Sequence, residues 1–169
     1  MRVCIYGAGA IGGMLGFLLQ KSGVDVTLIA RRNHYEEIKK NGLTFVSKEF
    51  NIEDTYKFKI YDSLENLGKF DLVINSLKAH SASQTADQVS KILDKDTILL
   101  PTLNGVPWWF FYKFGGKFDG YKLNSVDPER KLWKNINLEK VIGCVVYPAA
   151  IIYKPGIIHH IEGKRFILG

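Results

Sequence analysis

The sequence has little cysteine, and the two cysteines it has lie far apart. Neither has a neighbour at the short spacings of zinc or iron–sulfur sites. Cys4 and Cys144 each lie within an apolar stretch, so we expect two small buried hydrophobic residues in a reducing compartment. The cysteines therefore predict no disulfide, no bound metal and a cytoplasmic location.

Long hydrophobic runs and signal-peptide features are also absent. No stretch approaches the roughly 20 apolar residues that a transmembrane helix needs, and a strand pattern begins directly after Met1. With 46% hydrophobic residues, the chain can bury one sizeable core but not two large domains. We therefore predict a single domain over residues 1–169 that does not interact with membranes.

Acidic residues are fewer than basic ones, which gives a formal net charge of +6. The lysines are scattered along the chain, and they form no stripe or known nucleic-acid-binding motif. We therefore exclude nucleic acid as a partner. A positive field that attracts a phosphorylated cofactor and an acidic substrate is the simpler use of this charge.

Glycine, in contrast, is concentrated near the start of the chain. A short apolar run over 2–6 leads into Gly7-Ala8-Gly9-Ala10-Ile11-Gly12, and the apolar spacing of 11–21 then predicts a helix. In a dinucleotide-binding turn the first glycine permits a sharp turn, the second lets the main chain approach a pyrophosphate, and the third permits close helix packing. Free N–H groups at the helix start then face the phosphates. The segment from Gly7 to Gly12 is therefore predicted to bind a dinucleotide.

The second predicted strand, 24–30, ends in arginine where many NAD-binding sites carry an acid. An Asp or Glu there binds the ribose 2′-hydroxyl and would repel a 2′-phosphate. Here Arg31 and Arg32 follow the strand, and a guanidinium offers charge-assisted hydrogen bonds to phosphate. The sequence therefore favours NADPH, with Arg31 as the first choice for the 2′-phosphate contact and Arg32 as the second. The alternative is that both are solvated loop charges.

Strand and helix patterns alternate through the middle of the chain. Near-continuous apolar runs predict strands buried on both faces at 70–77 and 97–103, with a helix over 79–93 between them. Shorter strands at 43–46 and 56–60 are predicted as an excursion between the second and third strands of the parallel sheet. This order predicts a Rossmann-like, doubly wound, mainly parallel α/β sheet.

Extra strands are predicted near the C-terminal end of the chain, at 141–146 and around His159 and His160. Consecutive residues of a strand point to opposite faces, so only one of these histidines can face the core. We expect hydrogen-bonded strand histidines there rather than catalytic ones.

Polar side chains come just past the ends of the predicted parallel strands. Ligands of such sheets bind beyond the carboxyl ends of the strands. Arg31, Lys78 and Asn104 each follow one of these ends, which puts two cations and an amide on the same rim as the glycine turn. The alternatives are an exposed lysine at a helix start and a plain turn residue before glycine.

In this order, the motifs resemble the N-terminal nucleotide-binding domain of the ketopantoate reductase (2-dehydropantoate 2-reductase) family. The resemblance covers essentially the whole chain. It is carried by the glycine turn, the arginine after the second strand, Leu77-Lys78-Ala79, Leu103-Asn104-Gly105-Val106 and Pro155-Gly156-Ile157-Ile158-His159-His160.

The resemblance implies an NADPH-dependent oxidoreductase that reduces a 2-oxo acid, most directly 2-dehydropantoate to pantoate in pantothenate and coenzyme A biosynthesis. It implies Arg31 on the 2′-phosphate, and Lys78 and Asn104 near the nicotinamide. It also implies a substrate contact by Asn104 and a further cofactor contact at Ala150, in the Ala149-Ala150 segment. The implied partner is a small 2-oxo acid, and a homodimer stays open.

In the family that the chain resembles, the proton donor is a lysine on a second, all-helical domain. This chain ends at Gly169, where that domain would begin. We therefore expect no catalytic residue within residues 1–169, which would be the NADP-binding half of a two-domain reductase and inactive alone. The alternative is a non-catalytic NADP(H)-binding or redox-sensing module.

The segment 107–121 departs from the family pattern because it is rich in aromatic residues and glycine. We predict a loop insertion that borders the cleft, and we favour packing or domain contact over substrate stacking. An insertion that faced the substrate would indicate a related carbonyl or imine reductase with a bulkier substrate than ketopantoate.

Overall fold

A five-stranded parallel sheet forms the centre of the computed structural model, which describes residues 1–169 apart from the side chain of His80. The chain starts in the middle of this sheet and winds outward in both directions, as in a Rossmann fold. The predicted doubly wound sheet is therefore confirmed. In spatial order the strands are β5 (Lys59–Tyr61), β2 (Asp25–Ile29), β1 (Arg2–Tyr6), β6 (Leu72–Asn75) and β7 (Ile98–Pro101).

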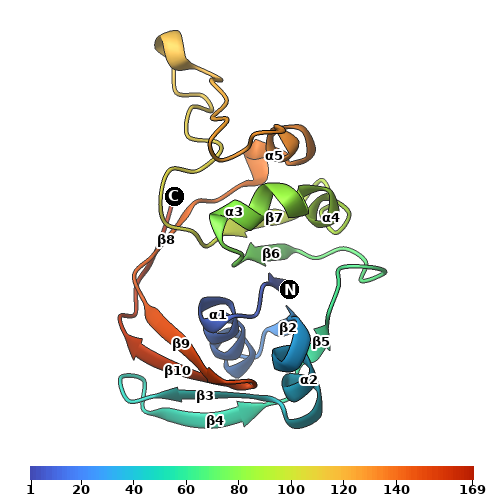
Figure 1. The fold of residues 1–169 in the computed structure, drawn as a ribbon, viewed down its shortest axis with the longest axis vertical. Coiled ribbons are helices and arrows are strands. Elements are labelled where there is room, and N and C mark those ends of the chain that lie inside the picture. The colour runs from blue at the N-terminus through green and yellow to red at the C-terminus, as the bar shows by residue number, and fades with distance from the viewer.

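Helices cover both faces of this sheet (Figure 1). One side carries α1 (Ala10–Lys21) and α2 (Arg32–Asn41), and the other carries α3 (Ala79–Ala82), α4 (Ala86–Ser90) and α5 (Lys131–Asn135). The predicted first strand, glycine turn, first helix and second strand are all present within a residue or two of the expected bounds.

A second, four-stranded sheet lies on the far side of α1 from the parallel sheet (Figure 1). Its strands are, in spatial order, β4 (Ile52–Tyr56), β3 (Leu43–Ser47), β10 (Ile157–Glu162) and β9 (Ala149–Lys154). β3 pairs in parallel with β10, so the end of the chain folds back onto its first third. The α1 helix is thereby enclosed between two sheets.

The predicted strands 43–46 and 56–60 are distributed between the two sheets differently from the prediction. The predicted strand 56–60 combines the end of β4 at Tyr56 with the start of β5 at Lys59. β5 joins the parallel sheet beside β2, whereas β3 and β4 belong to the second sheet. The excursion therefore builds a separate layer, which an alternating pattern alone does not distinguish from a strand of the main sheet.

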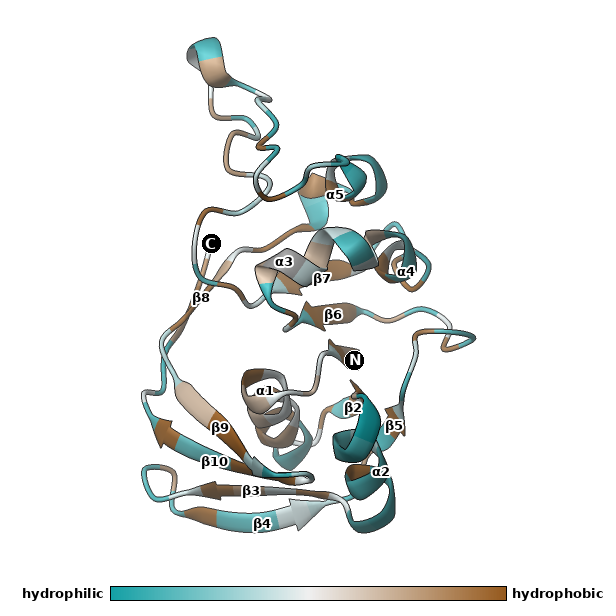
Figure 2. Ribbon diagram, in the orientation of Figure 1, coloured by the Kyte–Doolittle hydropathy of each residue, from teal (hydrophilic) through white to brown (hydrophobic). Residues whose placement is uncertain are grey.

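Two helices also differ from the prediction. The expected helix over 79–93 is divided by a 3₁₀ turn, Ser83–Thr85, between α3 and α4. α2 was not predicted at all, because Ile38 is its single buried residue and the helix is almost wholly hydrophilic (Figure 2). Its apolar face consists only of Tyr35 and Ile38, which pack on the first core cluster, and two apolar residues are a short pattern to recognise in a sequence.

The core consists of two clusters, one on each side of the parallel sheet. The first lies between the sheet, α1 and the second sheet, and the second lies under α3, α4 and α5. Cys4 belongs to the second cluster and Cys144 to the first, so the prediction of two buried cysteines is confirmed. Burial raises the pKa of the Cys4 thiol to about 12, so this thiol stays protonated and unreactive at neutral pH.

The aromatic segment forms an arm that projects from the α5 end of the molecule (Figure 1). It contains a 3₁₀ turn, Gly116–Phe118, and a second such turn, Leu138–Lys140, follows α5. Near the base of the arm, β8 (Cys144–Val146) pairs with β11 (Phe166–Leu168) in a small antiparallel sheet. β8 lies within the predicted strand 141–146, whereas β11 was not predicted as a strand.

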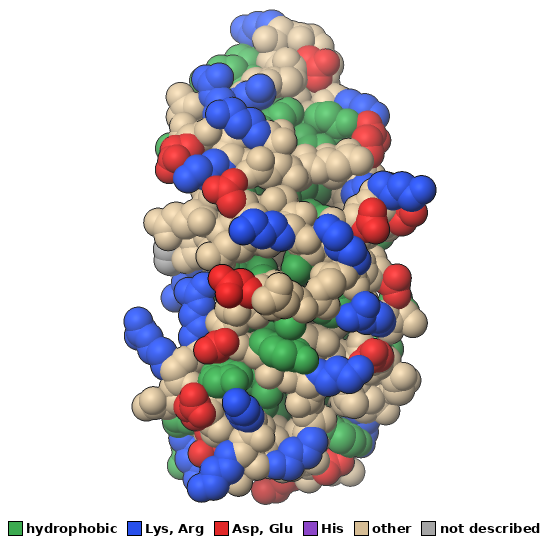
Figure 3. Space-filling view, turned by 90° about the vertical axis from the view of Figure 1, so that its right-hand side faces the viewer, with side chains coloured by type: hydrophobic (Ala, Val, Ile, Leu, Met, Phe, Trp, Pro, Cys, Tyr) green, Lys and Arg blue, Asp and Glu red, His purple; other side chains and the backbone are tan. Residues whose placement is uncertain are grey.

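The surface charge follows the scattered pattern seen in the sequence. On the face shown in Figure 3, lysine and arginine side chains alternate with acidic ones over the height of the molecule. Among the residues that the structure describes, no helix is long and apolar enough to cross a membrane.

Candidate functional site

A cavity of about 670 Å³ opens at the carboxyl end of the parallel sheet, where β1, β2, β6 and β7 end. Its volume is within the range of roughly 300 to 1,000 Å³ typical of cofactor sites. Three polar residues predicted at the strand ends, Arg31, Lys78 and Asn104, line this one cavity. The whole glycine turn lines it as well: Gly7, Ala8, Gly9, Ala10, Ile11 and Gly12.

The first glycine makes the turn. Gly7 has a φ of +95°, a conformation that other residues rarely adopt, and a Cβ there would lie 2.8 Å from Leu77 Cδ2. The N–H groups of Gly7 and Ala8 both donate to the carbonyl oxygen of Ile29, at 3.2 and 2.8 Å. The turn is therefore fixed to the end of β2.

The second and third glycines differ in what surrounds them. A Cβ added at Gly9 would meet no atom within 4 Å, so the protein itself does not require glycine there. A Cβ added at Gly12 would lie 2.2 Å from the carbonyl oxygen of Gly7, so α1 requires glycine for its close approach to the turn. Gly9 thus leaves open space at the cavity, which fits a pyrophosphate close to the main chain.

The helix that follows the turn begins at Ala10 and points its N-terminal end at the cavity. The first N–H groups of any α-helix have no acceptor within the helix. The first turn of α1 contains no acidic residue that would compete for them. These groups and the positive end of the helix dipole favour an anion in the cavity.

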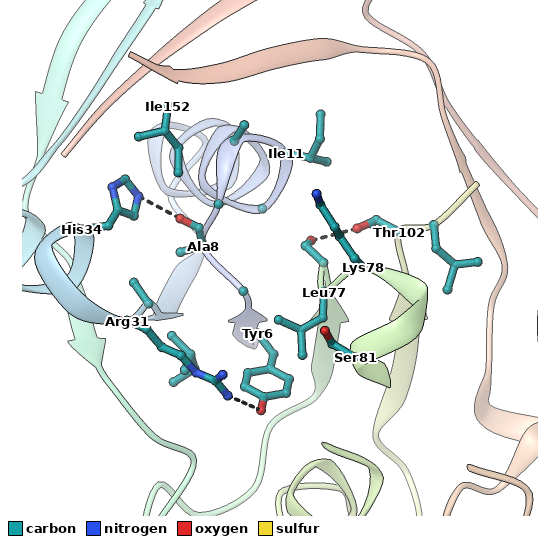
Figure 4. A pocket seen from close by; sticks show the side chains of 18 of the residues that line it. Tyr6, Ala8, Ile11, Arg31, His34, Leu77, Lys78, Ser81, Thr102 and Ile152 are labelled. Atoms are coloured by element: carbon teal, nitrogen blue, oxygen red, sulfur yellow. Dashed lines mark hydrogen bonds between the residues drawn. The ribbon is translucent and has the colours of Figure 1, made fainter. Parts of the chain in front are cut away.

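Arg31 lines the cavity at the start of α2, whereas Arg32 does not. The Arg31 guanidinium donates to the Tyr6 hydroxyl at 3.4 Å (Figure 4). Among the described residues, the lining contains two cations, Arg31 and Lys78, and no carboxylate. Such a lining suits a ligand with several phosphates.

Lys78 and Asn104 lie on the opposite rim from Arg31. Lys78 immediately precedes α3, and its side chain extends toward the α1 side of the cavity (Figure 4). The Asn104 side chain is held by the main chain of Val146: its Nδ2 donates to the carbonyl oxygen and its Oδ1 accepts from the N–H, both at 2.9 Å. One N–H and one oxygen lone pair of Asn104 remain for a ligand.

Ala150 and the aromatic segment 107–121 are not among the residues that line this cavity. Ala150 is half-buried and packs against the first core cluster, while Ile152, two residues along β9, reaches the cavity. Trp108 is buried in the second cluster, and Phe114 is exposed on the arm. The aromatic arm therefore does not border the cleft, because it projects from the far end of the fold (Figure 1).

Several lining residues had no signal in the sequence. His34 is half-buried between the glycine turn and the β9–β10 turn: its Nε2 donates to Ala8 O at 2.9 Å, and its Nδ1 accepts from the Gly156 N–H at 3.0 Å. Burial lowers the pKa of His34, consistent with a neutral ring. Tyr6, Ser76, Ser81 and Thr102 complete the polar lining, and Thr102 donates to Ser76 at 2.8 Å.

The two strand histidines occupy structural positions. His160 is buried and contacts Ser47 Oγ at 2.8 Å and Gly163 O at 2.7 Å, whereas His159 stacks on Tyr153. The expectation that one of them faces the core is confirmed. Within the described part of the chain, no group of three or more His, Cys, Asp or Glu residues is placed to hold a metal ion.

A parallel sheet that starts at its middle strand, with a glycine turn and a helix N-terminus at its carboxyl edge, defines a Rossmann-type domain of the nucleotide-binding class. The sequence model of the family described as ketopantoate reductase PanE/ApbA matches residues 3–107. The chain belongs to this family.

Known relatives agree with this assignment. A 2-dehydropantoate 2-reductase from Mesorhizobium japonicum is 43% identical over 170 residues, which cover 100% of this chain and 52% of the relative. The solved 2-dehydropantoate 2-reductase from Geobacter metallireducens GS-15 is 32% identical with a TM-score of 0.80, covering 100% of this chain and 49% of the other. The chain thus spans about half the length of these relatives.

Another similar solved structure belongs to an enzyme with a different name. It is a D-mandelate dehydrogenase in a ternary complex with NADH and anilino(oxo)acetate. Its identity is 25% and its TM-score is 0.75, over 96% of this chain and 46% of that one. The family's fold therefore occurs in an enzyme with a different 2-hydroxy acid substrate.

Proposed function

We propose that this chain is the NADPH-binding half of a reductase that converts a 2-oxo acid, 2-dehydropantoate in the first instance, to the 2-hydroxy acid. The observation that carries this proposal is the pairing of two features at one cavity. The three glycines provide a turn, an open space and a close helix approach, and Arg31 lies nearby with no carboxylate among the described lining residues.

In this proposal each part of the lining has one task. The turn from Gly7 to Gly12 and the start of α1 hold the pyrophosphate through main-chain N–H groups. Arg31 holds the 2′-phosphate of the adenosine ribose through its planar guanidinium. Lys78 and Asn104 face the nicotinamide end, where the free N–H and lone pair of Asn104 orient the carboxamide or the substrate.

The bound NADPH supplies the hydride that reduces the keto carbon. The residues of this chain hold the cofactor in place and set its orientation at the carboxyl edge of the sheet. We assign no proton donor to this chain. We propose that the remaining half of such a reductase supplies the donor and covers the cavity, in line with the relatives being about twice as long.

The proposal extends to the cellular role of the protein. A reductase of 2-dehydropantoate acts in pantothenate biosynthesis, and we propose that it does so in the cytoplasm, with a small 2-oxo acid as its partner. Measurement of its mass in solution tests for a homodimer.

Calorimetric titration of this chain with NADPH and with NADH tests the cofactor half of the proposal. We expect NADPH to bind more tightly than NADH, and Arg31→Ala to remove that difference. Arg32→Ala, which alters an arginine outside the lining, is the matched control and should leave the preference in place. Equal binding of both cofactors by the unaltered chain would overturn the NADPH assignment.

Measurement of turnover tests the proposed substrate. The protein encoded by the full reading frame that includes this chain should oxidise NADPH in the presence of 2-dehydropantoate. The oxo acid that corresponds to mandelate is the second substrate to assay, because a D-mandelate dehydrogenase shares the fold. Turnover of the aromatic oxo acid alone would replace the first substrate by the second.

A further inference from the structure

A buried tyrosine, Tyr6, lies beside the arginine that faces the cavity. The residue is 2% exposed and belongs to the second core cluster, so packing fixes the position of its ring. The hydroxyl oxygen lies 3.1 Å from Gln88 Oε1 and 3.4 Å from Arg31 Nη2. Figure 4 shows the Arg31 guanidinium turned toward this hydroxyl at the edge of the cavity. Residues from β1, α4 and the start of α2 thus meet at one oxygen atom.

The chemistry of the partners sets the direction of both hydrogen bonds. Arginine only donates, so the Tyr6 hydroxyl accepts from Arg31. Gln88 Oε1 only accepts, so the single hydroxyl proton points to Gln88. Arg31 therefore donates to Tyr6, and Tyr6 donates to Gln88. At 3.4 Å the first bond is long, so the guanidinium is kept near the cavity and stays free to turn toward a ligand.

We propose that the Tyr6 hydroxyl is a positioning group that strengthens the preference for a 2′-phosphorylated dinucleotide by holding Arg31 at the cavity. This inference rests on the proposed function as an NADPH-binding chain. A free arginine side chain samples many rotamers and loses that freedom when it binds phosphate. An arginine already held near the site loses less, which tightens binding. Tyr6 acts through Arg31, so only ligands with a 2′-phosphate respond to it.

Tyr6→Phe tests this role because it keeps the buried ring and removes only the hydroxyl. We expect the Kd of NADPH to rise about three- to tenfold while that of NADH stays within about twofold. Adenosine 2′,5′-bisphosphate and AMP should show the same contrast, since they differ in the 2′-phosphate and lack the nicotinamide.

Two further single variants distinguish loss of the Tyr6 hydrogen bonds from a general effect of substitution on folding. Gln88→Met alters an exposed residue of α4 and removes the acceptor of the Tyr6 hydroxyl, so a smaller change in the same direction is expected. Tyr35→Phe is the matched control: its hydroxyl contacts Lys39 at 3.0 Å, outside the cavity lining. The ratio of the NADPH and NADH affinities should not change in that variant.

The double variant Tyr6→Phe/Arg31→Ala separates positioning from a purely structural role. Its ratio of NADPH to NADH affinity should equal that of Arg31→Ala alone, because Tyr6 has no effect once Arg31 is absent. Two results would overturn the inference and leave the proposed function standing. In the first, Tyr6→Phe weakens the binding of NADPH and NADH equally. In the second, Tyr6→Phe leaves the ratio of the two affinities unchanged while Arg31→Ala abolishes the preference. If the unaltered chain binds both cofactors equally and Arg31→Ala changes neither affinity, the NADPH assignment fails and this inference fails with it.

Discussion

At the scale of single residues, Gly9 and Gly12 separate the demands of a ligand from the demands of the fold. Both belong to one motif, yet a Cβ would meet nothing within 4 Å at Gly9 and a carbonyl oxygen at 2.2 Å at Gly12. Gly9 also has a φ of −74°, which alanine adopts without strain. The motif assigns the second glycine to the pyrophosphate and the third to helix packing, and the space around each glycine in the structure fits that division.

The two glycines should therefore respond differently to alanine. In Gly9→Ala the weaker N-cap and the stiffer unfolded chain offset each other, so the free energy of unfolding should change by less than about 1 kcal/mol. Its affinity for NADPH should fall at least about tenfold, because a methyl group occupies the space of the pyrophosphate. Gly12→Ala should lose about 1 to 3 kcal/mol of stability by overpacking. Urea unfolding and calorimetry measure both quantities, and equal destabilisation by the two variants would refute this distinction.

His34 links the glycine turn to the second sheet through both ring nitrogens. Its Nδ1 accepts from the Gly156 N–H, so protonation of Nδ1 would place two hydrogens against each other. Burial lowers the pKa of His34 from its usual 6.5. The unfolded chain therefore takes up the proton at a higher pH than the folded chain does, and acid favours unfolding.

The His34 contribution should be complete well above pH 6.5 and should be lost as the pH falls from 6.5 through the folded-state pKa. His34→Gln lacks a group that titrates there. We expect wild type to be more stable than this variant by about 1 to 2 kcal/mol above pH 6.5, from two hydrogen bonds. The difference should shrink on acidification. Urea unfolding at a series of pH values measures it, and parallel pH profiles for the two proteins would contradict this account.

At the scale of elements, prediction succeeded where the pattern is local and failed where it depends on distant partners. The first strand, turn and helix follow from apolar spacing and glycines within one short segment. α2 was not predicted because it buries only Ile38. The second sheet was not predicted because β3 pairs with β10, which comes from the far end of the chain. Arg31, Lys78 and Asn104 were predictable from strand ends, whereas His34 and Tyr6 join the lining through tertiary contacts.

The short helix α5 depends on one buried carboxylate. Asp127 is 1% exposed and accepts from Ser83 Oγ at 2.9 Å and from the N–H groups of Leu132 and Trp133 at 3.3 and 3.1 Å. It thus joins α5 to the turn between α3 and α4. A helix of five residues is not stable alone, so this carboxylate and the burial of Leu132 in the second cluster hold it in place.

Asp127→Ala should therefore lower the free energy of unfolding by about 2 to 3 kcal/mol, since buried donors lose their acceptor. Asp119→Ala, on the exposed arm, is the matched control and should change stability by less than about 0.5 kcal/mol. Denaturant unfolding followed by circular dichroism compares them. Similar stabilities for the two variants would mean that α5 is held by its apolar contacts instead.

At the scale of the whole molecule, the return of β10 onto β3 raises the question of whether the two core clusters unfold together. The parallel sheet separates the clusters, but it contributes side chains to both. Ile5 and Cys4 are neighbours on β1, and they face the first and the second cluster respectively. A strand shared in this way couples the clusters. If one cluster unfolds and takes the strand with it, the side chains that the strand contributes to the other cluster are also exposed.

Ile158→Ala tests this coupling from the far side of the molecule. Ile158 is 0% exposed in the first cluster, and its Cδ1 fills the space that a Cβ at Gly13 would take, so its truncation should cost about 3 kcal/mol. The chain has 3 tryptophans, and all of them lie in or against the second cluster. If the clusters unfold as one unit, the tryptophan fluorescence midpoint in urea should fall by as much as the circular dichroism midpoint. A fluorescence midpoint that stays at the wild-type value would mean that the clusters unfold independently, with the parallel sheet as the boundary between them.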